Sequence, residues 1–156
     1  MAERKLNYAE GTSFLIPLRK GGYARGVVAR MNGKGVVFGY FFGPKFENAE
    51  SGIVDKALTA QNAIFIGKFG DLGFLKGEWP IIGKIEPWVR ADWPLPPLLR
   101  TDERAQIGFI SYYDDNSLRC LREEKIKLGD VDIHKFPEDS LLGYGAAEIH
   151  LTKLLG

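Results

Sequence analysis

Residues 13–42 of this 156-residue chain read SFLIPLRKGGYARGVVARMNGKGVVFGYFF, and they hold its strongest structural signal. Three apolar runs rich in aromatic and β-branched residues alternate with glycine-containing turns, which is typical of consecutive strands. Asn32 and Gly33 tolerate the positive φ that a type I′ hairpin turn requires. Pro17 cannot donate a ladder hydrogen bond, so its strand is expected to be an edge or to carry a bulge. The stretch predicts an antiparallel three-stranded meander at 13–18, 23–31 and 36–42.

The rest of the chain predicts further strands and two helices. Apolar positions in 51–60 define one face of a short middle helix, and those in 146–155 define one stripe of a C-terminal helix. A second hairpin is expected from 107–113 and 117–122, joined by an Asp-Asp-Asn turn. A buried strand at 63–69 and an extended proline-rich connection at 87–97 complete the pattern. The predicted fold class is therefore α+β, one mostly antiparallel domain over 1–156.

The charge balance argues against a general polyanion binder. The chain has 21 Lys and Arg against 20 Asp and Glu, for a net charge of +1. Residues 1–46, however, carry 8 basic and 2 acidic side chains, whereas residues 47–156 carry 13 basic and 18 acidic ones. We therefore expect a surface with two electrostatic characters.

The N-terminal sequence, the lack of a long apolar run and the single cysteine lead us to expect a cytoplasmic protein. No secretory or transit leader and no run of 18 apolar residues is present, so we expect neither export nor a membrane span. Cys120 is the single cysteine, which excludes an intramolecular disulfide and a cysteine-rich zinc site. The alternation around Cys120 predicts an inert or partly buried thiol, with activation by the flanking arginines as the alternative.

Motifs for enzyme chemistry are missing from the sequence. His134 and His150 belong to no HxH or HExxH pattern, and no GxSxG, Walker A or GxGxxG spacing occurs. Neighbouring carboxylates such as Asp114 and Asp115 do not converge when they lie on a strand, because adjacent residues point to opposite faces. We accordingly expect no metal centre, no cofactor and no small-molecule substrate.

Two charged regions are candidates for binding. Cations and aromatic residues are interleaved in the meander, which would suit a nucleic acid; the alternative is a half-buried sheet with a basic outer face. Residues 130–148 hold five acidic side chains against Lys135 alone, which would suit a basic protein partner; the alternative is a solvated acidic face.

Several segments in order resemble the immunity protein 26 family of bacterial proteins encoded beside polymorphic toxins. The matching elements are GTSFLIPL at 11–18, GYARGVV at 22–28, GEWPIIGK at 77–84, Pro96-Pro97 before Ile107, and PEDSLLGYGAAE at 137–148. The resemblance implies a non-enzymatic cytoplasmic protein that binds a cognate contact-dependent or secreted toxin effector and so protects the producing cell. Such proteins commonly cover the toxin's active site or hold the toxin inactive.

The resemblance supplies no catalytic residues, and two alternatives stay open. Some relatives carry a phosphotriesterase label, which gives a phosphotriesterase-like hydrolase as the first alternative. A nucleic-acid-binding module that uses the basic meander is the second.

Toxin-binding residues are predicted as aromatic anchors ringed by carboxylates, mainly in the acidic C-terminal half. The predicted set is Asp114, Asp115, Asp130, Asp132, Tyr112 and Trp93.

Overall fold

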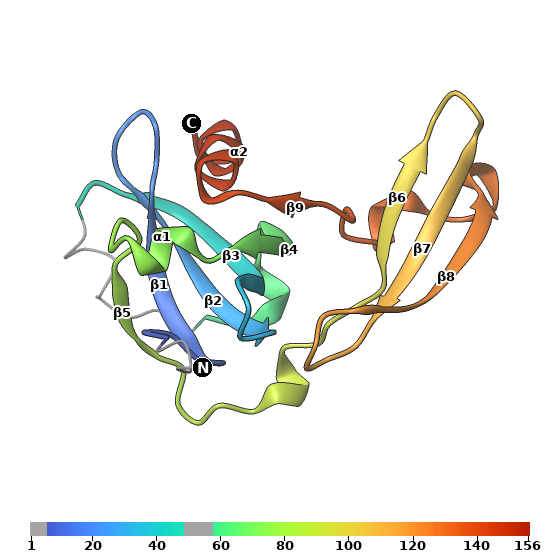
Figure 1. Ribbon diagram of the computed structural model, residues 1–156. Helices are drawn as coiled ribbons and strands as arrows, with labels where there is room; N and C mark the ends of the chain where they lie inside the picture. Colours follow the sequence, from blue (N-terminus) through green and yellow to red (C-terminus); the bar gives the residue numbers. More distant parts are fainter. Residues whose placement is uncertain (1–5, 49–57) are drawn as a thin grey trace.

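The computed structural model describes residues 6–48 and 58–156, which form two β-sheets and two α-helices (Figure 1). The main sheet has the strand order β5-β1-β2-β3-β4-β9, and the second sheet has the order β6-β7-β8. The strands are β1 Thr12–Pro17, β2 Tyr23–Met31, β3 Val36–Phe46, β4 Phe65–Gly70, β5 Ile81–Lys84, β6 Leu98–Asp102, β7 Ile107–Tyr113, β8 Cys120–Lys127 and β9 Leu141–Leu142. The helices are α1 Leu72–Leu75 and α2 Tyr144–Leu155. The predicted α+β class is confirmed.

The three-stranded meander is confirmed as β1, β2 and β3, which pair antiparallel in sequence order. β1 is not an edge strand, because β5 pairs with its other side. The register against β5 shifts between Ser13 and Phe14, so β1 does carry an irregularity, but it lies three residues before Pro17 and not at the proline that predicted it. β5 pairs only with 12–14, and Pro17 therefore lies beyond the stretch where β5 requires a donor.

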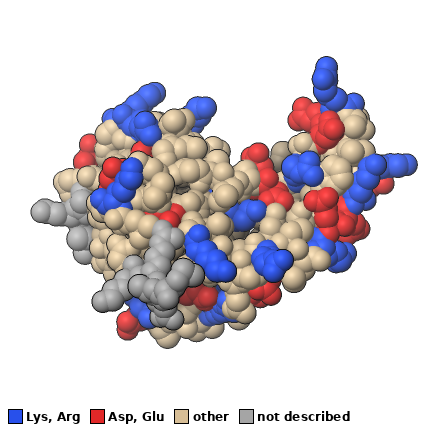
Figure 2. Space-filling view, in the orientation of Figure 1, with Lys and Arg blue, Asp and Glu red and all other residues tan. Residues whose placement is uncertain are grey.

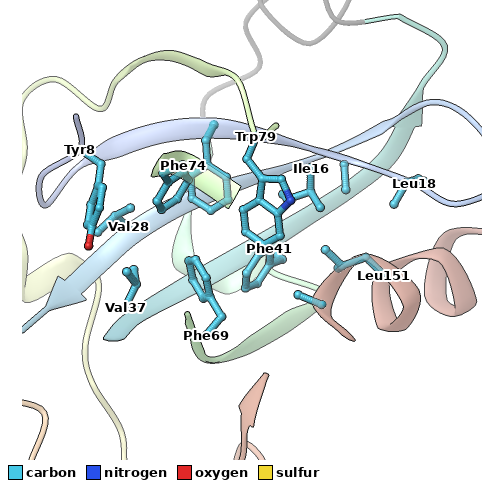
Figure 3. Packing of buried hydrophobic residues seen from close by; sticks show 13 residues of the cluster. Tyr8, Ile16, Leu18, Val28, Val37, Phe41, Phe69, Phe74, Trp79 and Leu151 are labelled. Atoms are coloured by element: carbon cyan, nitrogen blue, oxygen red, sulfur yellow. The ribbon is translucent and has the colours of Figure 1, made fainter. Parts of the chain in front are cut away.

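One face of the main sheet carries a cluster of aromatic rings. Trp79 is stacked on Phe14, with ring centroids 5.7 Å apart and an interplanar angle of 8°. Figure 3 shows Phe41, Phe69, Phe74 and Trp79 pointing toward one another beside α2. The sheet makes room for these rings with glycine, since a Cβ on Gly26 would lie 2.4 Å from the Phe14 ring. Gly26 lies within β2, where the absence of a side chain makes room for the Phe14 ring; it does not form a turn.

The opposite face of the main sheet is buried as well. Phe38, Tyr40 and Phe42 pack there against Trp93 and Leu98. The expectation of a half-buried meander with a basic outer face is therefore wrong. The proline-rich connection at 87–97 crosses this face and covers it, and its extended path is broken only by a short 3-10 helix at Arg90–Asp92.

The predicted C-terminal helix is confirmed as α2, and a buried carboxylate fixes its position. Glu148 is 8% exposed and accepts hydrogen bonds from Trp79 Nε1 at 2.9 Å and from Arg19 Nε at 3.1 Å. The backbone N–H of Arg19 donates to Thr152 Oγ1 at 2.9 Å. Leu151 on the same helix face is fully buried in the aromatic cluster. The helix is thus held by apolar packing and by a charged acceptor that two donors satisfy.

The other predicted elements have mixed outcomes. The strand predicted at 63–69 is confirmed as β4, but it is only partly buried, since Gly67 and Phe69 are its only buried residues. The second hairpin is confirmed, although β8 begins and ends later than expected. Of the inert or partly buried thiol predicted at Cys120, the partly buried alternative is wrong, because Cys120 is exposed on the outer strand of its sheet. The middle helix predicted at 51–60 falls mainly outside the described residues. Within the described ranges, no helix has the length and apolar character of a membrane span.

Replacing the buried acceptor of α2 tests this account of the fold. Glu148→Ala leaves the Trp79 and Arg19 donors without their acceptor, and we expect it to lower the free energy of unfolding by about 2–4 kcal/mol. Glu148→Gln keeps one oxygen acceptor and is expected to cost less. Glu78→Ala, at an exposed carboxylate beside Trp79, is the control and should change stability by less than about 0.5 kcal/mol. Urea unfolding measures all three; equal stability of the Glu148→Ala and Glu78→Ala variants would contradict the prediction.

Candidate functional site

The β6-β7-β8 sheet, called here the projecting sheet, stands away from the main sheet (Figure 1). Figure 2 shows it as an arm with a notch between its free end and the body, and with Lys, Arg, Asp and Glu side chains mixed along its length. Its two edges differ. Leu99 of β6 exchanges backbone hydrogen bonds with Pro137 and Asp139, both at 2.9 Å, whereas β8 pairs only with β7 within the described chain.

The exposed side chains of β8, with Arg100, Phe109 and Tyr112 beside them, make up what we call the β8 surface. Every residue of β8 except Ile126 is exposed, and Leu121 is 68% exposed. The Arg100 guanidinium lies 4.5 Å from the Phe109 ring centroid, and the Arg122 guanidinium lies 3.8 Å from that of Tyr112. Aromatic and arginine side chains are enriched in protein interfaces, so this surface has the chemistry of a protein-binding site.

The projecting sheet is joined to the main sheet by three side chains, called here the junction cluster: Lys68, Tyr113 and Asp139. Lys68 Nζ lies 3.0 Å from Asp139 Oδ1 and 4.0 Å from the centroid of the Tyr113 ring. The Tyr113 hydroxyl donates to Asp139 Oδ2 at 2.7 Å. The Lys68 and Asp139 side chains are only 12% and 11% exposed, so this ion pair is largely shielded from water. The cluster links β4, β7 and the segment before β9.

Burial and pairing together move the pKa values of the junction cluster. Burial by itself lowers the pKa of Lys68, but hydrogen bonds to Tyr113 and Asp139 and the Asp139 charge outweigh it and raise the pKa. Burial raises the pKa of Tyr113, and the neighbouring Lys68 opposes that shift. Both groups therefore hold their protons more tightly in the folded protein than in the unfolded chain.

A second connection forms at the turn between β7 and β8. The buried Arg30 of β2 donates to Asp115 Oδ1 at 2.9 Å and to the backbone oxygen of Trp93 at 2.9 Å. Arg90 donates to the backbone oxygen of Asp115 at 2.8 Å and to Glu10 Oε1 at 2.9 Å. These two arginines fasten the base of the projecting sheet to the body.

Both histidines of the chain line one groove of about 390 Å³ between the start of β4 and the segment 134–138. Glu138 lies in the same groove, and His150 packs edge-on against Phe65, with ring centroids 4.6 Å apart. Sequence motifs do not predict that the two histidines line one groove, because His134 and His150 lie 16 positions apart on different elements. In the part of the chain that the structure describes, His, Cys, Asp and Glu form no group of three that could hold a metal ion.

The chain matches one protein-family model. The family model for immunity protein 26 matches residues 9–106. This chain belongs to the immunity protein 26 family. The matched residues run from the segment before β1 to the turn between β6 and β7. Comparisons with curated proteins and with solved structures give no match.

Family membership confirms the resemblance drawn from the sequence and identifies the chain as an immunity protein. Immunity proteins of this kind have a cognate toxin as partner, and the family is in general not enzymatic.

The six predicted toxin-binding residues of the immunity protein do not form one patch. Tyr112 lies on the β8 surface, where its hydroxyl is 3.4 Å from Glu124 Oε2. Asp114 and Asp115 lie at the base of the projecting sheet. Asp114 accepts hydrogen bonds from the backbone N–H groups of 117 and 116, at 2.7 and 3.0 Å, which lower its pKa. Asp115 is paired with Arg30, so both carboxylates have structural partners.

The remaining three predicted residues of the immunity protein lie elsewhere. Asp130 and Asp132 are exposed in the segment that follows β8, at the end of the projecting sheet opposite the 114–119 turn. Asp132 accepts from the backbone N–H of His134 at 3.0 Å and lines a pocket of about 420 Å³ with apolar neighbours that include Ile133. Trp93 is 4% exposed and packs in the core, so it offers a partner no exposed ring.

The features that sequence reasoning missed in the immunity protein are Arg122, Leu121 and Lys125 on the outer strand, and the junction cluster. A run of charge at 119–127 was visible in the sequence, but only the sheet order shows that this strand has an open edge. For the aromatic residues of the basic meander, in contrast, the sequence suggested a binding role that the structure does not allow. Tyr40, Phe41 and Phe42 are buried and cannot stack on bases.

Breaking the junction cluster is expected to destabilise the immunity protein. Lys68→Met leaves Asp139 without its cation and should lower the free energy of unfolding by about 1–3 kcal/mol. The double variant Lys68→Met/Asp139→Asn should lower the free energy of unfolding by about 1 kcal/mol less than the sum of the two single changes. Each single change leaves one buried charge without its partner, whereas the double variant removes both charges. Lys153→Met, at an exposed position of α2, is the matched control. Urea unfolding of all four variants checks this prediction, and strict additivity would contradict it.

The immunity protein is also expected to lose stability at alkaline pH. Burial raises the pKa of Tyr40 from 10.0 to about 12, and the pKa values of Lys68 and Tyr113 are raised from 10.5 and 10.0. A raised pKa means that the folded state binds the proton more tightly. The associated stability is complete below pH 10 and is lost as the pH rises through the folded-state values. Thermal unfolding between pH 8 and pH 12 should show this decline, and it should be shallower for Tyr40→Phe. A melting temperature that does not fall in this range would refute the expectation.

Proposed function

We propose that this immunity protein neutralises the toxin domain encoded beside it by forming a non-covalent one-to-one complex in the cytoplasm of the producing cell. Family membership supports the existence of a cognate toxin. The complex would protect the cell either by covering the toxin's active site or by holding the toxin in an inactive state. Binding, and not turnover, carries the protective effect.

The observation that carries the proposal is the β8 surface. It combines an uncovered strand edge with two cation–π pairs, Arg100–Phe109 on one face of the projecting sheet and Arg122–Tyr112 on the other, and with several carboxylate groups. Aromatic and arginine side chains supply most of the affinity in typical interfaces, and charges orient the partner. Of the predicted residues, Tyr112, Asp130 and Asp132 stay in the proposed contact set.

Rigidity of the projecting sheet also favours this surface. The junction cluster and the Arg30–Asp115 pair hold the base of the sheet against the body. A surface held in its binding geometry loses little conformational entropy on association, so more of the contact energy appears as affinity.

Binding measurements with the neighbouring toxin domain test the proposal. The double variant Tyr112→Ala/Arg122→Ala removes one cation–π pair, and we expect the Kd to rise roughly 30-fold or more, since central aromatic and arginine contacts contribute about 2 kcal/mol or more. Lys20→Ala, in the turn between β1 and β2, is the control and should stay within about twofold. Calorimetry gives the Kd, and co-expression with the toxin gives the protection. No complex with the unaltered protein would overturn the proposal.

Phosphate ester hydrolysis is the second candidate, and one observation favours it. His134, His150 and Glu138 line the same groove, where an imidazole would be placed to act as a general base. This candidate predicts turnover of phosphate esters that His134→Ala abolishes. Purified protein without turnover across added divalent metals would eliminate it.

A further inference from the structure

β8 has an outer edge whose backbone groups no described strand engages. Its eight residues pair on one side with β7 and form the end of the sheet order β6-β7-β8. A strand edge of this kind presents N–H and C=O groups in a row and is a template for a further strand.

The hydrogen-bond pattern shows which backbone groups of β8 face outward. The N–H of Leu128 donates to the oxygen of Gln106 at 3.1 Å, so the pair 106/128 is hydrogen-bonded. Because antiparallel pairs alternate along the ladder, Arg122, Glu124 and Ile126 direct their backbone groups to β7. The backbone groups of Glu123, Lys125 and Lys127 therefore point away from β7.

The other edge of the projecting sheet supports the same assignment. Leu99 directs its N–H and C=O to Pro137 and Asp139, so its neighbours on β6 bond to β7 at the odd-numbered residues 107, 109 and 111. The even-numbered residues of β7 then bond to β8, which agrees with the pattern deduced from Leu128.

The charges beside this edge indicate the partner's chemistry. Glu123 already lies near Ser111 Oγ at 3.4 Å and Arg100 at 3.9 Å. Among the described residues, no hydrogen bond or ion pair engages the ammonium groups of Lys125 and Lys127. Both ammonium groups lie on the sheet face that also carries Arg100 and Phe109. A strand laid along this edge gains from carboxylates opposite the two lysines.

A second copy of this chain is a poor occupant of the charged part of the edge, from Arg122 to Lys127. A two-fold axis perpendicular to the sheet pairs each central residue with itself, and its neighbours symmetrically. Centred on any charged residue from Arg122 to Lys127, this pairing sets that residue against its own copy. Centred on Ile126, it sets Lys125 against Lys127. Every such register therefore opposes like charges, which destabilises the pair.

We infer that the cognate toxin adds an extended strand to the outer edge of β8, with Asp or Glu side chains opposite Lys125 and Lys127. This inference rests on the proposed function and specifies how the two proteins meet. Backbone hydrogen bonds to 123, 125 and 127 supply the pairing, and the two lysines select an acidic strand.

Proline at one outward-facing position tests the backbone contact. Lys125→Pro removes an N–H that does not bond to β7, and edge strands tolerate proline at such sites, so the fold is expected to persist. Lys125→Ala removes the same side chain but keeps the N–H. We expect Lys125→Ala to raise the Kd for the toxin domain about threefold and Lys125→Pro to raise it by about tenfold more. Equal Kd values for the two variants would overturn strand addition.

Hydrogen exchange on the unaltered protein tests strand addition at the outer edge of β8 without any substitution. In the free protein, the amides of 122, 124 and 126 should be protected, while those of 123, 125 and 127 exchange fast. Strand addition protects the second set in the complex. A toxin complex in which these amides still exchange fast would overturn the inference and leave the proposed function standing. A dimer of the free protein that already protects them would overturn it in favour of a second copy. Absence of any toxin complex would overturn both proposals.

Discussion

Both faces of the β1–β4 sheet are apolar, and covering both of them determines where the rest of the chain lies. Trp79, Phe74 and α2 cover one face, and the connection at 87–97 covers the other with Trp93. Burying each large apolar side chain contributes about 1.5–3 kcal/mol, so neither face can be left to water. The connection that closes the second face also carries the chain away from the main sheet. The projecting sheet is a consequence of that route (Figure 1).

Charged side chains at the base of the projecting sheet then fix its orientation. Arg30 and Lys68 lie where water is largely excluded, so each requires an acceptor in one particular place. Asp115 supplies one acceptor from the turn between β7 and β8, and Asp139 supplies the other from the segment before β9. Apolar packing alone would leave the two sheets free to slide, because it has no direction. The ion pairs thus hold the β8 surface in a constant position relative to the main sheet.

The charges along β8 bear on two properties of its open edge: whether it pairs with a second copy of the chain, and which kind of strand it accepts. An open strand edge is a risk for association of like chains, and mixed charge along the edge opposes self-pairing. The same charges leave Lys125 and Lys127 available to a strand with carboxylates. Under the proposed strand addition, the same side chains that oppose self-pairing would also select the toxin.

Local pattern determined the meander, the second hairpin and the C-terminal helix, because turn residues and periodicity act over a few neighbours. The family resemblance came separately, from short segments that match in order along the chain. Local pattern did not separate glycines that make turns from Gly26, which seats the Phe14 ring. It also could not place Trp93 in the core, pair Arg30 with Asp115, or bring His134 and His150 into one groove. These contacts join residues between 16 and 85 positions apart. Only the packing of both sheet faces brings such residues together, so the tertiary structure alone decided which strand edge stayed open.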